Sequence, residues 1–258
     1  MPSSKREREY ERRRYEKWQE RQAAKRAQRR RNQLIAGGVV AVLVVAIGVT
    51  TAVLLGRDDS DATATLDPTP TSTAPVIGGE ARTGNDGQLP DKALAEDREW
   101  TGTLSLNEGE LGIELDGAAA PQAVANFVTL AQEGYFDGTD CHRLTTSQLY
   151  VLQCGDPTAT GSGGPGYSFG PVENAPKDGV YPAGTIAMAR SQTADSQGSQ
   201  FFIVYEDTEL PDETGYTVFG QVTSGLDVIQ AIADAGVVDG ATDGQPATRV
   251  TIEGVETQ

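Results

Sequence analysis

The most continuous apolar run of the chain is LIAGGVVAVLVVAIGVTTAVLL, residues 34–55, which holds no charged residue and no proline. At about 1.5 Å per residue, a helix of this length reaches about 33 Å, more than the roughly 30 Å of a bilayer's hydrocarbon core. A buried helix of a soluble domain is the alternative, but such helices rarely lack polar residues over this length. The pattern therefore predicts a transmembrane helix.

The C-terminal part of the chain shows periodic patterns of apolar and polar residues. Residues 101–107 (TGTLSLN) and 110–117 (ELGIELDG) alternate apolar and polar positions around an Asn-Glu-Gly turn, which predicts a β-hairpin. Residues 120–136 carry an apolar stripe at helical spacing, with Pro121 at the first helical position and Gly134 as the stop. This stretch predicts an amphipathic helix.

The remaining apolar segments are short and are separated by Gly, Pro and Asp. They predict six more strands, a helix and a long loop. The strands are expected at 142–146, 150–154, 184–189, 199–205, 217–222 and 249–256, and the helix at 226–236. Many antiparallel strands with two helices predict a mainly β fold, a closed antiparallel barrel capped at its ends.

Charge is divided unevenly along the chain. Residues 1–33 hold thirteen Lys or Arg against five Glu, a net charge of +8, whereas the whole chain has −16. The remaining residues therefore carry −24. Because positive charge marks the cytoplasmic flank of a span, the pattern places the N-terminus in the cytoplasm and the acidic bulk outside, with residues 34–55 as a signal anchor.

Two other interpretations of the N-terminal part are weaker. A cleaved signal peptide usually has a short charged region, an apolar core shorter than 22 residues and a small-residue cleavage site, and this stretch fits none of them well. Nucleic-acid binding by the basic segment calls for interleaved aromatic stacking residues, while membrane topology and anionic lipid already account for its charge. We expect no nucleic-acid partner.

Composition divides the chain into four parts. Residues 56–96 are rich in Thr, Pro, Asp, Ala and Gly, a composition typical of a flexible linker. Residues 97–258 are numerous enough for one domain with its own core. The predicted organisation is a basic cytoplasmic segment (1–33), a transmembrane helix (34–55), a linker (56–96) and a folded domain (97–258).

The single histidine and both cysteines of the chain lie close together, within residues 141–154. Three such ligands are one short of a closed structural zinc site, and the chain has no further Cys or His to complete it. A thiol–imidazole pair is also disfavoured, because Cys141 and His142 are neighbours whose side chains would point to opposite faces of a strand. We expect no metal here, and we expect His142 to be a satisfied residue of the barrel interior.

Several short stretches occur in the order in which they occur in cyclophilins, the prolyl cis-trans isomerases. They are HR at 142–143, LQCGD at 152–156, GSGGPG at 161–166, AGTIAMA at 183–189, GSQFFI at 198–203 and VFGQV at 218–222. The resemblance covers about residues 98–256. It implies an eight-stranded antiparallel closed β-barrel capped by two α-helices, here preceded by a single transmembrane helix.

The resemblance also implies a reaction, the isomerisation of X-Pro peptide bonds over a barrier of about 20 kcal/mol. Arg143 matches the family's catalytic arginine, whose guanidinium would donate a hydrogen bond to the prolyl nitrogen as the bond twists. No nucleophile, metal or cofactor is needed. The proline ring would lie against Tyr150, Val151, Phe202, Leu210 and Tyr216. The flanking peptide would contact Gln153, Gly161, Ala189, Arg190, Ser191 and Gln200.

Some positions depart from the commoner family pattern. Leu210 stands where many members have Trp, and Pro211 follows it where Leu is usual. Tyr216 replaces a frequent His and Arg190 a frequent Asn, and the loop after Arg143 is two residues longer. These changes keep the pocket apolar, which still implies an isomerase, but loss of the indole donor argues against tight cyclosporin-type binding.

In an oxidising compartment outside the membrane, the two cysteines are expected to pair. A four-residue turn at 146–149 would place Cys141 opposite Cys154. The family geometry instead asks for Arg143 and Gln153 on one face, which this register gives only with a bulge. We expect a Cys141–Cys154 disulfide, and unpaired thiols in the core are the alternative.

The combined prediction is a membrane-anchored bacterial cyclophilin whose isomerase domain lies outside the cytoplasm. Its partners would be the lipid bilayer, through residues 34–55, and proline-containing segments of secreted or membrane proteins. The alternative is a non-catalytic module of the same fold that binds proline-containing segments without isomerising them.

Overall fold

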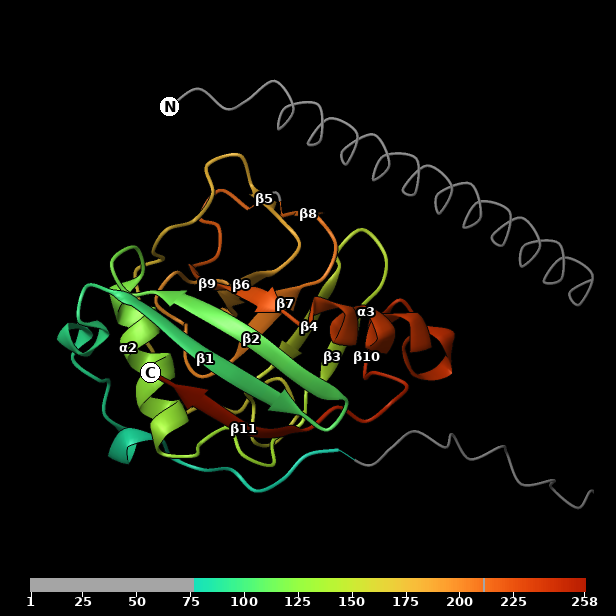
Figure 1. Ribbon diagram of the computed structural model, residues 1–258, viewed down its shortest axis with the longest axis horizontal. Helices are drawn as coiled ribbons and strands as arrows, with labels where there is room; N and C mark the ends of the chain where they lie inside the picture. The colour runs from blue at the N-terminus through green and yellow to red at the C-terminus, as the bar shows by residue number, and fades with distance from the viewer. Residues whose placement is uncertain (1–76, 211) are drawn as a thin grey trace, which may run out of the picture. The chain divides into compact units, whose positions relative to one another are not determined.

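The computed structural model of the protein describes residues 77–210 and 212–258 (Figure 1). The described residues belong to one compact unit. The predicted basic segment, the predicted span and about half of the predicted linker lie outside the described residues. Among the residues that are described, no helix combines the length and the apolar character that crossing a membrane requires.

Residues 77–96, which the composition assigned to the linker, pack on the domain. This stretch holds two 3₁₀ turns, η1 (Asn85–Gly87) and η2 (Lys92–Ala95). The Gly78 amide donates to the Asp140 carboxylate at 2.8 Å, and Arg82 Nη1 donates to the Tyr135 carbonyl at 3.0 Å. Ala95 at the end of η2 is fully buried in the core. The folded unit therefore begins before residue 97.

The N-terminal hairpin and helix form as their patterns predict. Strands β1 (Glu99–Leu106) and β2 (Gly109–Asp116) pair antiparallel over their whole length. Helix α2 (Pro121–Gln132) begins at the proline and ends before Gly134, whose φ of 66° suits a glycine that terminates a helix. The helix packs beside β11 and β2 (Figure 1).

All eight predicted strands occur in one nine-stranded sheet, in the order β10-β3-β4-β7-β6-β9-β2-β1-β11. The ninth strand, β10, was not predicted. A separate two-stranded sheet, β5-β8, was not predicted either. Helix α3 (Leu226–Ala235) follows β9, and the turn η3 (Val238–Gly240) follows α3. The remaining bounds are β3 (Arg143–Thr145), β4 (Val151–Cys154), β5 (Val180–Tyr181), β6 (Thr185–Met188), β7 (Phe201–Val204), β8 (Thr208–Glu209), β9 (Val218–Ser224), β10 (Asp243–Gly244) and β11 (Ile252–Thr257).

The predicted closed barrel is wrong, because the sheet is curled but open, with β10 and β11 as its end strands. Residues 138–141 do reach the start of β11: the Cys141 amide donates to Val250 and the Ile252 amide to Thr139. These bonds form a single isolated bridge, between Asp140 and Thr251. Since β10 occupies the free edge of β3, the ladder between β3 and β11 does not continue.

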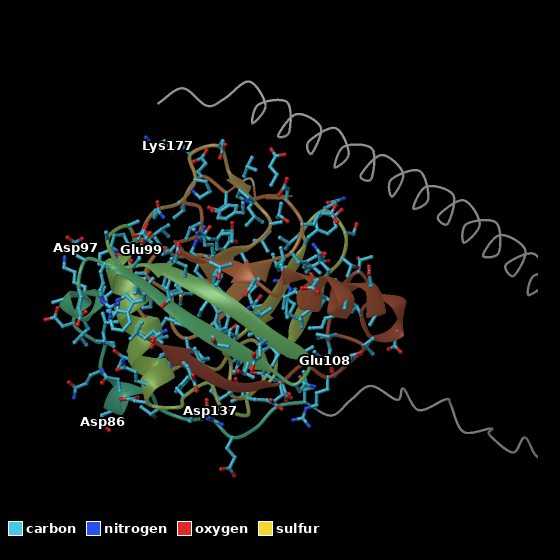
Figure 2. All side chains as sticks on the ribbon, in the orientation of Figure 1. Asp86, Asp97, Glu99, Glu108, Asp137 and Lys177 are labelled. Carbon is cyan, nitrogen blue, oxygen red and sulfur yellow. A yellow bond between two sulfur atoms is a disulfide. The ribbon has the colours of Figure 1, made fainter. Side chains whose placement is uncertain are left out.

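The core lies between the concave face of the sheet and the helices. At its centre, the ring of Phe127 from α2 lies 5.1 Å from Phe136, 5.4 Å from Phe201 and 5.3 Å from Phe219, measured between centroids. Most acidic side chains instead point outward, as Figure 2 shows for Asp86 and Glu108, both exposed, whereas Asp140 and Asp156 are buried. The negative charge of the domain is thus a property of its solvated surface.

Candidate active site

Strands β4, β6 and β7 separate two apolar clusters, because their side chains alternate between two faces. Leu152 and Phe201 point into the core described above, which we call the inner cluster. Val151 and Phe202 point to the opposite face and belong to a second, smaller cluster, the outer cluster. The outer cluster consists of Val151, Tyr181, Ala187, Phe202 and Val204, with Leu149, Ala189, Leu210, Tyr216 and Val218 packed against it.

The outer cluster contains four of the five residues predicted to surround a proline ring. Tyr150 is the exception and corrects the prediction: it packs against the inner cluster, with its ring 5.9 Å from that of Tyr205. The reason is strand alternation, since Val151 faces outward and its neighbour must face inward. Leu149, on the loop after β3, packs against the outer cluster.

Arg143 stands beside this cluster, with 39% of its side chain exposed. Asp243 accepts two hydrogen bonds from it, from Nε at 2.7 Å and from Nη2 at 2.8 Å. The Arg143 Nη1 donates to Gln153 Oε1 at 3.3 Å, across the β3–β4 ladder in which the two residues are directly paired. The hydrogen bond from Arg143 holds the pKa of Asp243 below its usual value, and in turn the pKa of Arg143 is raised.

Hydrogen bonds continue from Gln153 into a groove of about 440 Å³. Gln153 Nε2 donates to Gln200 Oε1 at 2.9 Å, and Gln200 Nε2 donates to the Gly163 carbonyl at 2.9 Å. The groove is lined mainly by small and polar residues, so it suits an extended peptide more than an apolar ring. It includes all six residues predicted to contact the flanking peptide: Gln153, Gly161, Ala189, Arg190, Ser191 and Gln200.

One wall of the groove is a glycine-rich loop that Asp156 organises. The Asp156 carboxylate accepts hydrogen bonds from the Thr158 amide at 2.8 Å and the Gly163 amide at 3.0 Å. Burial would raise the pKa of Asp156, but these hydrogen bonds outweigh it and the pKa is lowered. Gly163 must be glycine here, because a Cβ would lie 1.9 Å from the Asp156 Oδ1.

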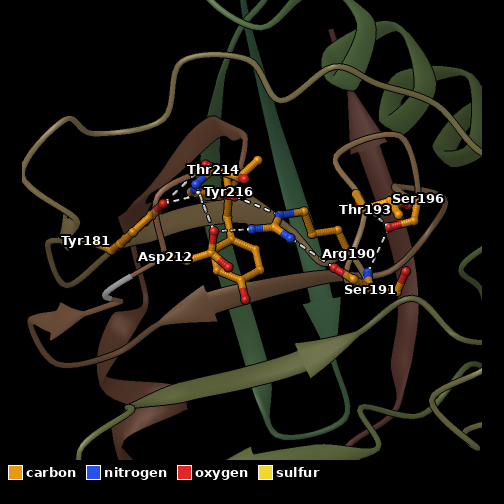
Figure 3. Close-up of polar contacts among 9 residues, drawn as sticks. Tyr181, Arg190, Ser191, Thr193, Ser196, Asp212, Thr214 and Tyr216 are labelled. Carbon is orange, nitrogen blue, oxygen red and sulfur yellow. Dashed lines mark hydrogen bonds and ion pairs between the residues drawn. The ribbon is translucent and has the colours of Figure 1, made fainter.

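The guanidinium of Arg190 binds the loop that carries Tyr216 (Figure 3). Nη2 lies 2.6 Å from Asp212 Oδ1, and Nε donates to the Gly215 carbonyl at 2.8 Å. The guanidinium carbon lies 4.7 Å from the centroid of the Tyr216 ring, and only 3% of the side chain is exposed. Arg190 thereby connects the groove to the outer cluster.

Tyr216 and Tyr181 pack together in the outer cluster. The Tyr216 amide donates to the Tyr181 hydroxyl at 2.8 Å, and burial raises the pKa of Tyr181. The Tyr216 ring packs edge-on against Phe202, with centroids 5.5 Å apart. Tyr216 stands where many cyclophilins have His. It is held by the hydrogen bond of its backbone amide to Tyr181 and by the Arg190 guanidinium over its ring.

Cys141 and Cys154 form a disulfide. The predicted register is off by one residue. With Cys141 opposite Cys154, Arg143 would pair with Leu152, but it pairs with Gln153. Cys141 lies beyond the end of that ladder, where its amide bonds to Val250. The two sulfur atoms meet inside the inner cluster, and the face shared by Arg143 and Gln153 requires no bulge.

The prediction for His142, an interior residue with its hydrogen bonds satisfied, is wrong. It is half-buried, and its Nδ1 has no hydrogen-bond partner within the part of the chain that the structure describes. The edge with Nε2 faces Gly161, at 3.8 Å from where a Cβ of that residue would lie. Burial lowers the pKa of His142.

The sequence patterns did not point to Asp243 or Asp212. Both are acidic residues in irregular stretches of an acidic chain, and Asp243 is 100 positions from Arg143. Such pairings carry no local signal. Tyr181, which lies on the two-residue strand β5, is a further residue of this kind.

Comparison with known families identifies the fold. Residues 101–257 match the family model described as cyclophilin type peptidyl-prolyl cis-trans isomerase/CLD. A crystal structure of a cyclophilin type peptidyl-prolyl cis-trans isomerase from Cryptosporidium parvum superposes with a TM-score of 0.54 at 26% identity, over 62% of this chain and 98% of that one. A second structure of the same protein, in the presence of the dipeptide Ala-Pro, gives a TM-score of 0.52 at 27% identity, over 61% of this chain and 98% of that one.

Curated relatives carry the same family name. The chain is 46% identical over 163 residues to a probable peptidyl-prolyl cis-trans isomerase B of Mycobacterium leprae, and 48% identical over 165 residues to that of Mycobacterium tuberculosis. These alignments cover 58% and 59% of this chain but only 54% and 53% of the relatives, so the chain spans about half their length. The peptidyl-prolyl cis-trans isomerase B of Bacillus subtilis is 41% identical over 140 residues, which are 54% of this chain and 94% of that protein.

Proposed function

The chain belongs to the cyclophilin family of peptidyl-prolyl cis-trans isomerases, and from this premise we propose that its domain isomerises X-Pro peptide bonds in other polypeptides. Rotation about such a bond meets a barrier of about 20 kcal/mol, which arises from amide resonance. Since no covalent bond is broken, catalysis requires only a site that stabilises the twisted amide more than either planar form.

The observation that carries the proposal is the position of Arg143 between the outer cluster and the groove. The outer cluster offers an apolar surface to a proline ring, and the groove offers polar contacts to the residues beside it. As the amide twists, a lone pair localises on the prolyl nitrogen. The guanidinium of Arg143, which is charged at every physiological pH, would donate a hydrogen bond to that nitrogen and favour the twisted state.

Substitution of Arg143 tests this mechanism. We expect Arg143→Ala and Arg143→Lys to lower kcat/KM for a proline-containing peptide roughly 100-fold, because an ammonium group cannot reproduce the planar fork. Exchange between cis and trans peptide, followed by NMR, measures the rate without a coupling enzyme. Arg249→Ala is a suitable control, because Arg249 also forms two hydrogen bonds to a carboxylate, that of Asp140.

Two outcomes would contradict the proposal. A folded Arg143→Ala chain with near-wild-type turnover would exclude the role of this arginine. A wild-type chain that binds the peptide but does not accelerate its exchange would favour the alternative function, a non-catalytic module that holds proline-containing segments.

We also propose that the isomerase acts outside the cytoplasm, anchored by residues 34–55, on secreted or membrane proteins. The basic segment and the uncharged run support this topology, and the Cys141–Cys154 disulfide supports an oxidising compartment. Protease added to intact spheroplasts should release a soluble domain that retains isomerase activity. Complete protection of the domain until the membrane is lysed would contradict this location.

A further inference from the structure

A carboxylate from a distant part of the chain faces the guanidinium of Arg143. Asp243 lies on the two-residue strand β10, opposite Thr145 of β3. Arg143 is two positions before Thr145 and so lies diagonally across from Asp243 on the same face, within reach of long side chains. The two oxygen atoms of Asp243 lie 2.7 Å and 2.8 Å from Nε and Nη2 of Arg143.

We propose that Asp243 is a positioning residue for isomerisation, which fixes the plane and direction of the Arg143 guanidinium. This inference rests on the proposed function. Asp243 does not touch the prolyl peptide in this scheme and acts only through the arginine. It extends the site to an end strand of the sheet, outside the outer cluster and the groove.

Arg143 is held from two sides. Asp243 takes the Nε edge, and Gln153 accepts from Nη1 at 3.3 Å. A guanidinium has five N–H groups, and the three bonds described leave one N–H on Nη1 and one on Nη2 for a substrate. Both of these belong to the tip of the side chain, so the carboxylate directs the donating end of Arg143 away from itself.

Orientation, rather than charge, is what Asp243 contributes. An arginine side chain is charged without help, and a neighbouring carboxylate would by itself weaken its attraction for an electron pair. A side chain that is 39% exposed would otherwise sample several rotamers, whereas a donor must meet the prolyl nitrogen in one direction. Because misplacement by about 1 Å can cost about 100-fold in rate, fixing the direction outweighs the partial compensation of charge.

Stability does not explain the pair equally well. Both partners are exposed, Arg143 by 39% and Asp243 by 55%, and exposed ion pairs contribute little to folding because water and salt screen them. Removal of the Asp243 charge should therefore leave the fold intact. This makes its effect on the reaction measurable in isolation.

The test is Asp243→Asn in the full-length chain. Asparagine keeps the size of the side chain, but its NH₂ group cannot accept a hydrogen bond from Arg143, so the two-bond contact is lost. We expect kcat/KM to fall about tenfold, while the dissociation constant for the peptide, from NMR titration, changes less than about twofold. Asp243→Glu retains a carboxylate and should recover part of the lost activity.

A double-mutant cycle separates positioning from a general structural role. In an Arg143→Ala background, Asp243→Asn should have no further effect on kcat/KM, because the residue through which it acts is gone. The NMR signal of the Arg143 Nε–H should lose its protection from solvent exchange in Asp243→Asn. The control Arg249→Gln removes the two hydrogen bonds from Arg249 to Asp140, a pair outside the groove and the outer cluster, and should leave kcat/KM unchanged.

The outcomes distinguish this inference from the function on which it rests. An inactive wild-type chain contradicts the proposed function. An active wild-type chain that loses activity in Arg143→Ala but not in Asp243→Asn contradicts only the positioning role. Equal effects of Asp243→Asn with and without Arg143 would also overturn it.

Discussion

The inner and outer clusters share the same three strands but are covered in different ways. On β7, Phe201 is fully buried in the inner cluster and its neighbour Phe202 is 5% exposed in the outer one. Regular elements, α2 and the β1–β2 hairpin, enclose the inner cluster. Segments with little regular structure, which carry Tyr181, Leu210 and Tyr216, cover the outer cluster.

The outer cluster also has charged neighbours. Residues 77–258 contain just seven Lys or Arg, and two of these, Arg143 and Arg190, adjoin the outer cluster. Both have carboxylate partners, Asp243 and Asp212. The inner cluster, which regular elements close, serves as the core, whereas the outer cluster, which less regular segments cover, is the surface at which we propose that a ligand binds.

The largest effect that tests this contrast is expected from two adjacent phenylalanines. Phe201→Ala should lower the free energy of unfolding by about 3–5 kcal/mol, because it removes a ring that packs against Phe127 and Phe136. Phe202→Ala should cost clearly less stability but should lower kcat/KM strongly, because the proposed proline pocket loses its floor. Urea unfolding and NMR exchange measure the two quantities.

If Phe201→Ala does not fold, Phe201→Leu provides a milder substitution at the same position. It should be destabilised less than Phe201→Ala and should keep most of its activity. If Phe202→Ala were as destabilising as Phe201→Ala and equally active per folded molecule, the two clusters would not differ in function.

The strands of both clusters could be predicted from alternation, since all eight predicted strands occur in the sheet. Alternation also places Val151 and Leu152 on opposite faces, so the orientation of one residue determines that of the other. Closure of the sheet could not be predicted, because it depends on how the two-residue strand β10 competes for the edge of β3. A strand of two residues has no period to detect.

The candidate site was predictable only in part. The resemblance identified the groove residues and Arg143, which the structure brings together. It misplaced Tyr150, because strand alternation next to Val151 turns Tyr150 toward the inner cluster, while Leu149 packs against the outer cluster. Asp243 and Asp212 depend on long-range geometry that no local pattern encodes.

A smaller effect is expected from the loop that covers the outer cluster. Arg190→Asn restores the residue that many cyclophilins have here but removes the contacts to Asp212, Gly215 and the Tyr216 ring. We expect a loss of about 1–2 kcal/mol in stability, because the cation–π contact of a desolvated arginine is of this size, while the ion pair with the exposed Asp212 adds little. KM should rise severalfold with a smaller change in kcat.

Arg98→Asn provides the matched control for Arg190→Asn. Arg98 also stacks on an aromatic ring, at 3.7 Å from the centroid of Trp100, and pairs with Glu96 at 2.7 Å. It is 41% exposed and contacts neither the groove nor the outer cluster. An equal rise of KM in both variants would show that Tyr216 does not depend on Arg190 for its position.

The smallest effect concerns His142, which lies between the disulfide of the inner cluster and Arg143. Burial lowers its pKa below the usual 6.5; the charge of Asp156 acts in the opposite direction, and that of Arg143 lowers the pKa further. The unfolded chain therefore binds a proton more readily than the folded chain, so stability is fully present above pH 6.5 and declines as the pH falls from 6.5 toward the folded-state value. Since the chain has one histidine, His142→Gln should remove this slope from urea unfolding curves measured between pH 7 and pH 5.5, a range roughly centred on the histidine pKa. A folded-state pKa at or above 6.5, from NMR titration of the imidazole, would contradict this prediction.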